Sequence, residues 1–248
     1  GYALVDNDPV LILGSAESES GTVPEIKSVD LTNNFNYTQI FKTAYGASGT
    51  ARAVAAAGGT YGGDNFLNQR RNKAIEHQRA IELQMLFGER IEVTTGALPI
   101  RTTGGLRQFI TSNVVAVGGA LTESILKSWM RSLFTEGRGS DQRIMLCSPV
   151  IAEAVSFWAQ DKIRVQVDTE KYGMSIKSYF TDFGTLVVRP HWLFSTGVYG
   201  GLAYAFDPSY VKLRVIPGRD TQIQYEVQDK GKDQVVDQYF SELSLEVA

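Results

Sequence analysis

The sequence has 248 residues, of which 43% are hydrophobic, 10% aromatic and 21% charged, a composition typical of a folded domain with a sizeable core. This composition excludes a disordered chain, a collagen, a coiled coil and a disulfide scaffold. The 24 basic and 27 acidic residues leave a net charge of -3, so no overall basic field is available to hold nucleic acid or an anionic membrane.

The cysteine content and the apolar runs indicate the kind of compartment in which the chain folds. A single cysteine, Cys147, cannot form an intrachain disulfide or a Cys-x-x-Cys motif, so folding in a reducing cytosol is permitted. Apolar runs such as Asn113–Val117 are far shorter than the roughly 18 residues that span a bilayer, and no signal peptide opens the chain. We therefore expect a soluble protein. Because residue 1 is Gly, we interpret the sequence as a processed or truncated product.

The first 63 residues are low in charge and rich in Gly, Ser, Thr and Asn, which predicts extended, loop-rich structure. A segment of this length without a strong helix cannot easily bury itself alone. It lies either on the rest of the molecule or on neighbouring molecules, and we favour the second arrangement. The Ala and Gly run at Ala53–Gly63 is interpreted as a joint to the helix that follows.

A long helix is predicted from Asp64 to Phe87, with Asp64 or Asn65 as its cap and Gly88 as its C-terminal stop. At 1.5 Å per residue it is roughly 34 Å long. Its apolar residues that share one face are Leu67, Ala74, Ile81 and Met85.

A basic cluster on this helix, Arg70-Arg71-x-Lys73, has two interpretations. One is phosphate contact, and the other is a solvated or subunit-facing surface paired with Glu76 and Glu82. We adopt the second because charge runs on long helices usually belong to solvated faces.

The rest of the chain alternates helices and strands. One helix is predicted from near Thr122 to before Gly137, a short strand over Arg143–Cys147, and a helix that opens at Ser148-Pro149 and runs through Trp158. Strands dominate from Ile163 onwards: Ile163–Val167, Thr185–Val188, Tyr210–Ile216 and Leu243–Val247, with turns at Asp182–Gly184 and Asp207-Pro208. The predicted fold class is α+β, not doubly wound.

The residues that most often perform catalysis are scarce. We interpret His77 as a surface or interface residue, His191 as a packed residue at a strand end, and Cys147 as a small core hydrophobe. No metal-binding histidine pair and no nucleophile elbow is present. We therefore assign no catalytic residue, no metal ligand and no cofactor-binding residue, and expect no cofactor and no enzymatic activity.

The glycine-rich stretch and the carboxylates add no site. No buried strand precedes Gly58–Gly63, as a dinucleotide fold requires, and the sequon Asn36-Tyr37-Thr38 occurs too often by chance to indicate glycosylation. Glu17 and Glu19 lie in a polar stretch where nothing raises their pKa for acid catalysis. A structural or binding protein becomes the leading class.

A series of short sequence motifs (phrases) in fixed order indicates a protein family. The phrases are Asn36–Phe41, Ser48–Ala51, the helix with Lys73, Ala74 and Glu82 before Leu86-Phe87-Gly88, then Pro99–Leu106, Gly118–Thr122 and Asp182–Gly184. In this order they resemble the major capsid proteins of tailed bacteriophages with the Hong Kong ninety-seven fold, in the branch first catalogued as a domain of unknown function. The resemblance covers most of the chain.

The resemblance implies a division of the chain. Residues 1–63 are then the return half of the extended E-loop and its connection, and 64–118 the spine helix and the start of the peripheral domain. Residues 119–215 are approximately the axial domain, and 216–248 return to the peripheral domain.

Two features of the family are not visible in this sequence. Family members have an N-terminal arm and an outgoing half of the E-loop, and neither precedes Gly1; the chain is either cleaved or begins late in the protein. Some relatives cross-link a loop lysine to an asparagine of the next subunit. Lys27 or Lys42 could take that part, but no motif identifies its partner, so we assign no cross-link.

The function that the resemblance implies is structural: hexamers and pentamers of an icosahedral shell around double-stranded DNA. The expected partners are copies of the chain itself, decoration, scaffolding and portal proteins, and DNA held without sequence readout, with no membrane. The expected location is the virion capsid, assembled in the bacterial cytoplasm. The alternatives are an encapsulin-like nanocompartment shell and, in another class, a motif-poor binding domain or hydrolase. The latter is disfavoured by Trp129, Trp158 and Trp192, which are expected to be buried.

Overall fold

The computed structural model describes residues 14, 19, 21–23, 34–56, 63–135, 139–162, 167–171, 174–195 and 197–247. By its internal contacts the chain divides into two units, Gly1–Asn34 and Phe35–Ala248. Every helix and strand of the described residues belongs to the second unit.

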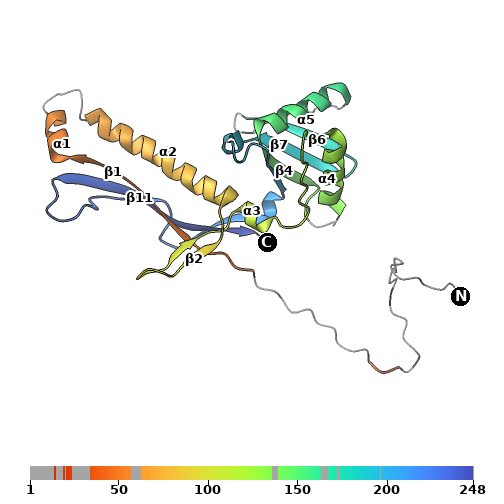
Figure 1. Ribbon diagram of the computed structural model, residues 1–248, viewed down its shortest axis with the longest axis horizontal. Coiled ribbons are helices and arrows are strands. Elements are labelled where there is room, and N and C mark those ends of the chain that lie inside the picture. Colours follow the sequence, from red (N-terminus) through yellow and green to blue (C-terminus); the bar gives the residue numbers. More distant parts are fainter. Residues whose placement is uncertain are drawn as a thin grey trace. The chain divides into compact units, whose positions relative to one another are not determined.

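A four-stranded antiparallel sheet is built around β11, the long strand Gln234–Val247 (Figure 1). Strand β1 (Gln39–Ser48) pairs with β11 over its whole length. Strands β9 (Val211–Val215) and β10 (Gln222–Gln224) also pair with β11. Because Leu243 is the register partner of both a β1 residue and a β9 residue, β1 lies on one side of β11 and β9 on the other.

Two helices follow β1, namely α1 (Gly49–Ala56) and α2 (Gly63–Phe87), and α2 packs against β1 and β11. The long predicted helix is thus confirmed. It ends as expected, because the N–H of Gly88 donates to the carbonyl of Gln84 at 2.8 Å.

The face of α2 that meets the sheet differs from the predicted one at its start. Ala74, Ile81 and Met85 are partly buried as expected, but the side chain of Leu67 is 61% exposed. The neighbouring Phe66 packs on the ring of Tyr45 instead, with ring centroids 5.4 Å apart. That contact fixes the rotation of the helix and turns Leu67 outward.

A short hairpin of β2 (Ile91–Val93) and β3 (Ile100–Thr102) follows α2, and the one-turn helix α3 (Leu106–Phe109) comes next. All hairpin residues from Ile91 to Arg101 are exposed. The hairpin therefore adds little to the core and presents its apolar side chains outward.

The second large sheet has five strands in the order β5-β6-β7-β4-β8. Strands β4 and β7 are parallel, whereas every other pairing in this sheet is antiparallel. The bounds are β4 Gln142–Cys147, β5 Val167–Lys171, β6 Met174–Thr181, β7 Gly184–Pro190 and β8 Ala203–Phe206. A mixed sheet with separate helices agrees with the predicted α+β class.

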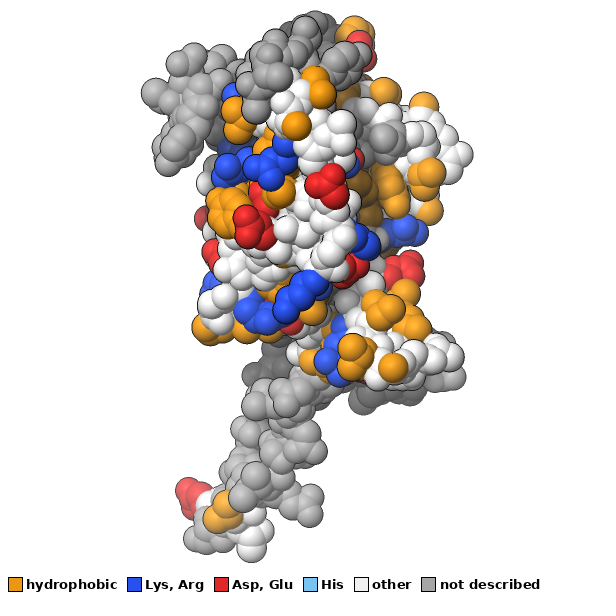
Figure 2. Space-filling view, turned by 90° about the vertical axis from the view of Figure 1, so that its left-hand side faces the viewer, with side chains coloured by type: hydrophobic (Ala, Val, Ile, Leu, Met, Phe, Trp, Pro, Cys, Tyr) orange, Lys and Arg blue, Asp and Glu red, His pale blue; other side chains and the backbone are white. Residues whose placement is uncertain are grey.

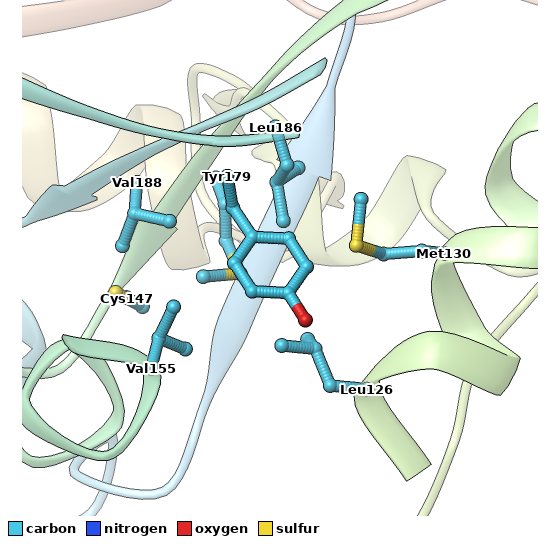
Figure 3. Packing of buried hydrophobic residues seen from close by; sticks show 8 residues of the cluster. Leu126, Met130, Cys147, Val155, Tyr179, Leu186 and Val188 are labelled. Atoms are coloured by element: carbon cyan, nitrogen blue, oxygen red, sulfur yellow. The ribbon is translucent and has the colours of Figure 1, made fainter. Parts of the chain in front are cut away.

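Helices α4 (Glu123–Thr135) and α5 (Pro149–Lys162) cover one face of this sheet. Each begins where the sequence predicts. The hydroxyl of Thr122 accepts from the N–H of Ile125, and that of Ser148, the predicted cap, accepts from the N–H of Ile151. Figure 3 shows side chains of both helices converging on the ring of Tyr179. The buried cluster consists of Leu126, Met130, Met145, Cys147, Val155, Tyr179, Leu186 and Val188.

A second buried cluster joins elements from both sheets. It brings together the end of α2, α3, the 3-10 turn η1 (Trp192–Ser195), β8 and the end of β11. The ring of Phe87 stacks on Tyr199 with centroids 3.9 Å apart and packs edge-on against Phe194. Its members are Leu86, Phe87, Leu106, Leu193, Phe194, Tyr204 and Leu245.

Residues 39–56 depart from the expectation for the first 63 residues. The backbone of β1 pairs with β11 of the same chain, and Gly49–Ala56 is helical rather than extended. The prediction that this stretch reaches onto neighbouring molecules is therefore wrong for 39–48, because β11 of the same chain already pairs with it. The predicted strand Ile163–Val167 and most of the glycine joint fall outside the described residues, and β5 begins at Val167.

Candidate functional site

Several of the phrases that carry the family resemblance meet in space at the end of α2. The side chain of Asn36 donates to the carbonyls of Gly104 (2.9 Å) and Leu245 (2.7 Å) and accepts from the N–H of Gly104 (2.7 Å). The side chain of Gln39 accepts from the N–H of Thr103 at 3.0 Å. Segments separated by up to 209 residues are thus joined by side-chain hydrogen bonds.

Glycine is required at this junction. The side chain of Gln84 donates to the carbonyl of Thr103 at 2.7 Å, and the N–H of Gly105 donates to the carbonyl of Gly88 at 2.9 Å. A Cβ on Gly105 would lie 2.5 Å from the carbonyl oxygen of Gln84, closer than side-chain carbons approach backbone. The motif around 99–106 therefore encodes a close approach of two backbones, and this explains the glycine at position 105.

His77 is the clearest correction to the sequence analysis, since it is buried rather than a surface or interface residue. Its side chain is 1% exposed. Its Nδ1 lies 2.9 Å from the hydroxyl of Thr43 on β1, and its Nε2 lies 2.8 Å from the hydroxyl of Ser241 on β11. The prediction was wrong because charged neighbours on the helix suggested solvent, whereas hydroxyls from distant strands satisfy the ring.

His191 lies directly after β7, and this position agrees with the predicted packed residue at a strand end. Its Nε2 is 2.8 Å from Oε1 of Glu82 on α2, and its own N–H donates to the carbonyl of Cys147. The guanidinium of Arg79 lies 4.9 Å from the ring of Trp192. Two side chains of α2 therefore contact the turn that follows β7.

Cys147 is a core residue, as predicted. Its side chain is fully buried, and burial raises the pKa of its thiol to about 11. A thiol with such a pKa is almost wholly protonated at neutral pH, so it is a poor nucleophile.

A buried ion pair, not predicted from the sequence, joins Arg143 on β4 to Asp207 after β8. Nη1 of Arg143 lies 2.6 Å from Oδ2 of Asp207. The backbone N–H and hydroxyl groups of Ser140 and Ser209 all donate to the same carboxylate. Burial alone would raise the pKa of Asp207, but these hydrogen bonds outweigh it and hold the pKa well below its usual value. Only the Asp207-Pro208 turn hinted at this role, because Asp207 also caps the turn η2 (Pro208–Tyr210).

The basic cluster of α2 behaves mainly as a surface. Lys73 forms an ion pair with Glu76, as expected, whereas Glu82 bonds to His191 instead. The carbonyl of Arg70 accepts from the hydroxyl of Tyr239. One depression of about 510 Å³ lies along this side of the helix. Its lining residues all belong to α2, so it has no opposite wall that could enclose a ligand.

Large apolar side chains are exposed on separate elements. The hairpin exposes Leu98 (79%) and Ile100 (65%), and the outer side of α5 exposes Val150 (71%) and Phe157 (66%). The outer side of α2 adds Leu67, Ile75 and Leu83. Trp192 is 48% exposed, contrary to the expectation for all three tryptophans, because it lies over Arg79 at the surface; Trp129 and Trp158 are partly buried as expected.

The base of the hairpin holds the chain entering β1. The guanidinium of Arg90 lies 4.3 Å from the ring of Phe35, and that of Arg101 lies 5.8 Å from the ring of Tyr37. The Tyr37 hydroxyl donates to Glu92 at 3.0 Å. These contacts attach residues 35–37, just before β1, to the hairpin.

Within the part of the chain that the structure describes, no group of three or more His, Cys, Asp or Glu side chains is placed to hold a metal ion. None of the helices described is both long enough and apolar enough to cross a bilayer.

Sequence comparison with known proteins matches this chain to one protein family. The model described as SU10 major capsid protein matches residues 14–248. A major capsid protein of Pseudomonas phage PaMx41 is 27% identical over 241 residues, which cover 92% of this chain and 56% of that protein. The chain thus spans about half the length of the curated relative that it matches.

One solved structure shares the fold of this chain. A chain from Mycobacterium phage Patience has a TM-score of 0.50 at 8% identity, covering 93% of this chain and 75% of that one. A chain from the satellite phage P4 procapsid including size determination (Sid) protein has a TM-score of 0.48 at 11% identity and covers 100% of this chain and 79% of that one.

Proposed function

The chain belongs to the SU10 major capsid protein family, and from this premise we propose that it assembles into hexamers and pentamers of an icosahedral shell that encloses double-stranded DNA. The predicted resemblance to tailed-phage major capsid proteins and the α+β fold of the Hong Kong ninety-seven type are confirmed. Proteins of this family are structural rather than enzymatic.

One observation carries the assembly proposal: large apolar side chains are exposed on several separate elements, including the hairpin, α2 and α5. In Figure 2, apolar side chains lie at separate places on one face, among basic and acidic ones. Such exposure costs solvation free energy unless partners cover it. A subunit of a closed shell contacts several neighbours at once, which would cover several surfaces.

The segment before β1 supplies a further contact in this proposal. By its internal contacts Gly1–Asn34 forms a unit of its own, and its sequence is too polar to form a core. We expect it to lie across a neighbouring subunit, as the return half of an E-loop would. Many weak repeated contacts then stabilise the shell through multivalency.

The near-neutral net charge of -3 fits dense packing of copies, because strong like charge would drive neighbouring subunits apart. DNA would be held by confinement and counterions rather than by base contacts. Decoration, scaffolding and portal proteins are the further partners that we propose. The location would be the virion capsid, with assembly in the bacterial cytoplasm.

The test is the size of the assembled protein. The purified chain is separated by size exclusion with light scattering, and the heaviest fraction is imaged by negative-stain electron microscopy. Closed shells or hexamer-sized capsomers support the proposal, and nucleic acid rather than cargo protein inside them separates a virus from a nanocompartment. A monomer or dimer at every protein and salt concentration contradicts it.

Two variants locate the contacts. Leu98→Ser combined with Ile100→Ser should keep the unfolding midpoint but abolish shells, while Leu98→Met with Ile100→Val, which keeps the hairpin apolar, should assemble normally.

Deletion of 15–32 should weaken the shells, since it removes most of the segment before β1. Shells of unchanged stability after the deletion would contradict the draping of this segment over a neighbour.

A further inference from the structure

The imidazole of His77 lies at the centre of the contact between α2 and the sheet. Hydroxyls of Thr43 and Ser241 bond its two ring nitrogens, and the Ser241 hydroxyl lies 2.8 Å from that of Thr221. The rings of Phe41 and Tyr239 pack against it at centroid distances of 6.4 and 5.9 Å. Residues of three separate segments thus close around one histidine of the helix.

A neutral imidazole suits this environment and a cation does not. Hydroxyl groups can each donate or accept, so they bond either form of the ring, but they carry no charge to balance a proton. Burial of an unbalanced charge is costly. Among the described residues, the hydrogen bonds to this ring come from hydroxyls, not from carboxylates.

The charged groups of the surrounding elements do not supply the missing balance. On α2, Lys73 and Glu76 form an ion pair with each other at the helix surface, and Arg70 adds positive charge. On the strands, Lys42 and Glu242 alternate with the residues that face His77, so they lie on the opposite side of the sheet. Beside Thr221, Arg219 pairs with Glu242, and the Asp220 carboxylate accepts from the backbone N–H of Thr221.

One carboxylate of β11 remains on the same side of the sheet. Asp237 shares the face of Ser241, but it is four residues away along the strand, or about 13 Å. Its carboxylate accepts from the N–H of Glu226 instead. The ring of His77 is therefore enclosed without a negative partner.

We propose that His77 makes the attachment of α2 to the β1–β11 sheet sensitive to acid, so that a proton on its ring loosens the helix from the sheet. The inference goes beyond shell assembly and holds for a single subunit. It gives the fold a conformational response to pH that acts on its longest helix.

The sign of this pH dependence follows from the linkage between proton binding and release of the helix. Burial lowers the pKa of His77 in the folded chain. Above the ordinary value, about 6.5, the ring is neutral in both the folded and released states and pH has no effect through this residue. As pH falls below that value, the released state takes up a proton first, so release is favoured by up to tenfold per pH unit until the folded pKa is reached.

The first test measures the pKa of each histidine in the unaltered chain from the pH dependence of deuterium exchange at the imidazole C2 position, read by mass spectrometry. The chain has two histidines, so each signal can be assigned to its own peptide. The proposal expects His77 to titrate below about 6.5. Titration at or above that value overturns it.

The second test measures amide hydrogen exchange of α2 between pH 7.5 and 5, corrected for the intrinsic rate. Protection of the helix should fall by up to tenfold per pH unit below about 6.5 in the parent chain, while strands β4 and β7 keep theirs. In His77→Gln this pH-dependent loss should vanish, whereas His191→Gln should retain it. Protection of α2 that is independent of pH, or a loss that persists in His77→Gln, would refute the proposal. If His77→Gln does not fold, the titration of the parent chain still decides.

Discussion

The two helix–sheet layers of this protein are held together by different chemistry. Helices α4 and α5 meet their sheet through an apolar cluster that includes Leu126, Met130 and Leu186. Helix α2 meets the β1–β11 sheet through a buried histidine, hydroxyl groups and aromatic rings. The stability of an apolar helix–sheet contact depends mainly on the volume and shape of its side chains. The stability of a polar contact depends on each buried hydrogen bond being made.

The largest loss of stability is expected at the edge of the apolar layer, where Arg143 and Asp207 form a buried ion pair. Asp207→Asn places an amide against the donors of Ser140 and Ser209 and removes the charge that faces the buried guanidinium. Breaking a buried pair typically costs about 3–5 kcal/mol. Denaturant unfolding measures the loss.

Asp229→Asn is the matched control, because the Asp229 side chain is 78% exposed and pairs with Lys232 at the surface. It should change stability by less than about 1 kcal/mol. The pKa of Asp207 is lowered, so its contribution is fully present above about pH 4 and is lost as pH falls below that value. Equal losses in the two variants would show that burial of the pair does not matter.

Met130→Ala tests the apolar layer itself. The side chain is completely buried between α4 and the sheet (Figure 3), and its truncation leaves a cavity that costs about 2–5 kcal/mol. Met130→Leu, which nearly conserves volume, should cost less than about 1.5 kcal/mol. Thermal unfolding of both variants gives the comparison, and a cost near zero for Met130→Ala would mean that the layer collapses around the gap.

Asn36→Leu tests the polar junction with little change in volume. The substitution removes the bonds to Gly104 and Leu245 and leaves partly buried backbone groups unsatisfied, at a cost of about 1–3 kcal/mol. Urea unfolding reports the loss. Thr38→Val, at a residue with one weak bond of 3.3 Å to Glu242, is the control that should stay near the parent value. An unchanged midpoint for Asn36→Leu would place the junction's stability in its apolar contacts instead.

The same contrast explains how much the sequence could predict. Helical spacing predicted α4, its apolar face and its start near Thr122, and the start of α5 at Ser148 was found because such signals are local. His77 was misread, since the hydroxyls that bury it come from residues 34 positions earlier and 164 positions later. The burial of Asp207 was missed for the same reason, as Arg143 is 64 residues away. Local patterns specify elements, whereas polar partners are specified only by the fold.

The smallest effect is expected on the outer side of α2, where a charged pair lies outside both layers. Lys73 and Glu76 have side chains 40% and 58% exposed, and solvent screens their attraction. A double-mutant cycle of Lys73→Ala and Glu76→Ala should give a coupling of about 0.5 kcal/mol or less, which falls further in high salt. A coupling several times larger would require a desolvated pair. In that case the outer side of the helix would be covered in the protein as measured, and its stability should then vary with protein concentration.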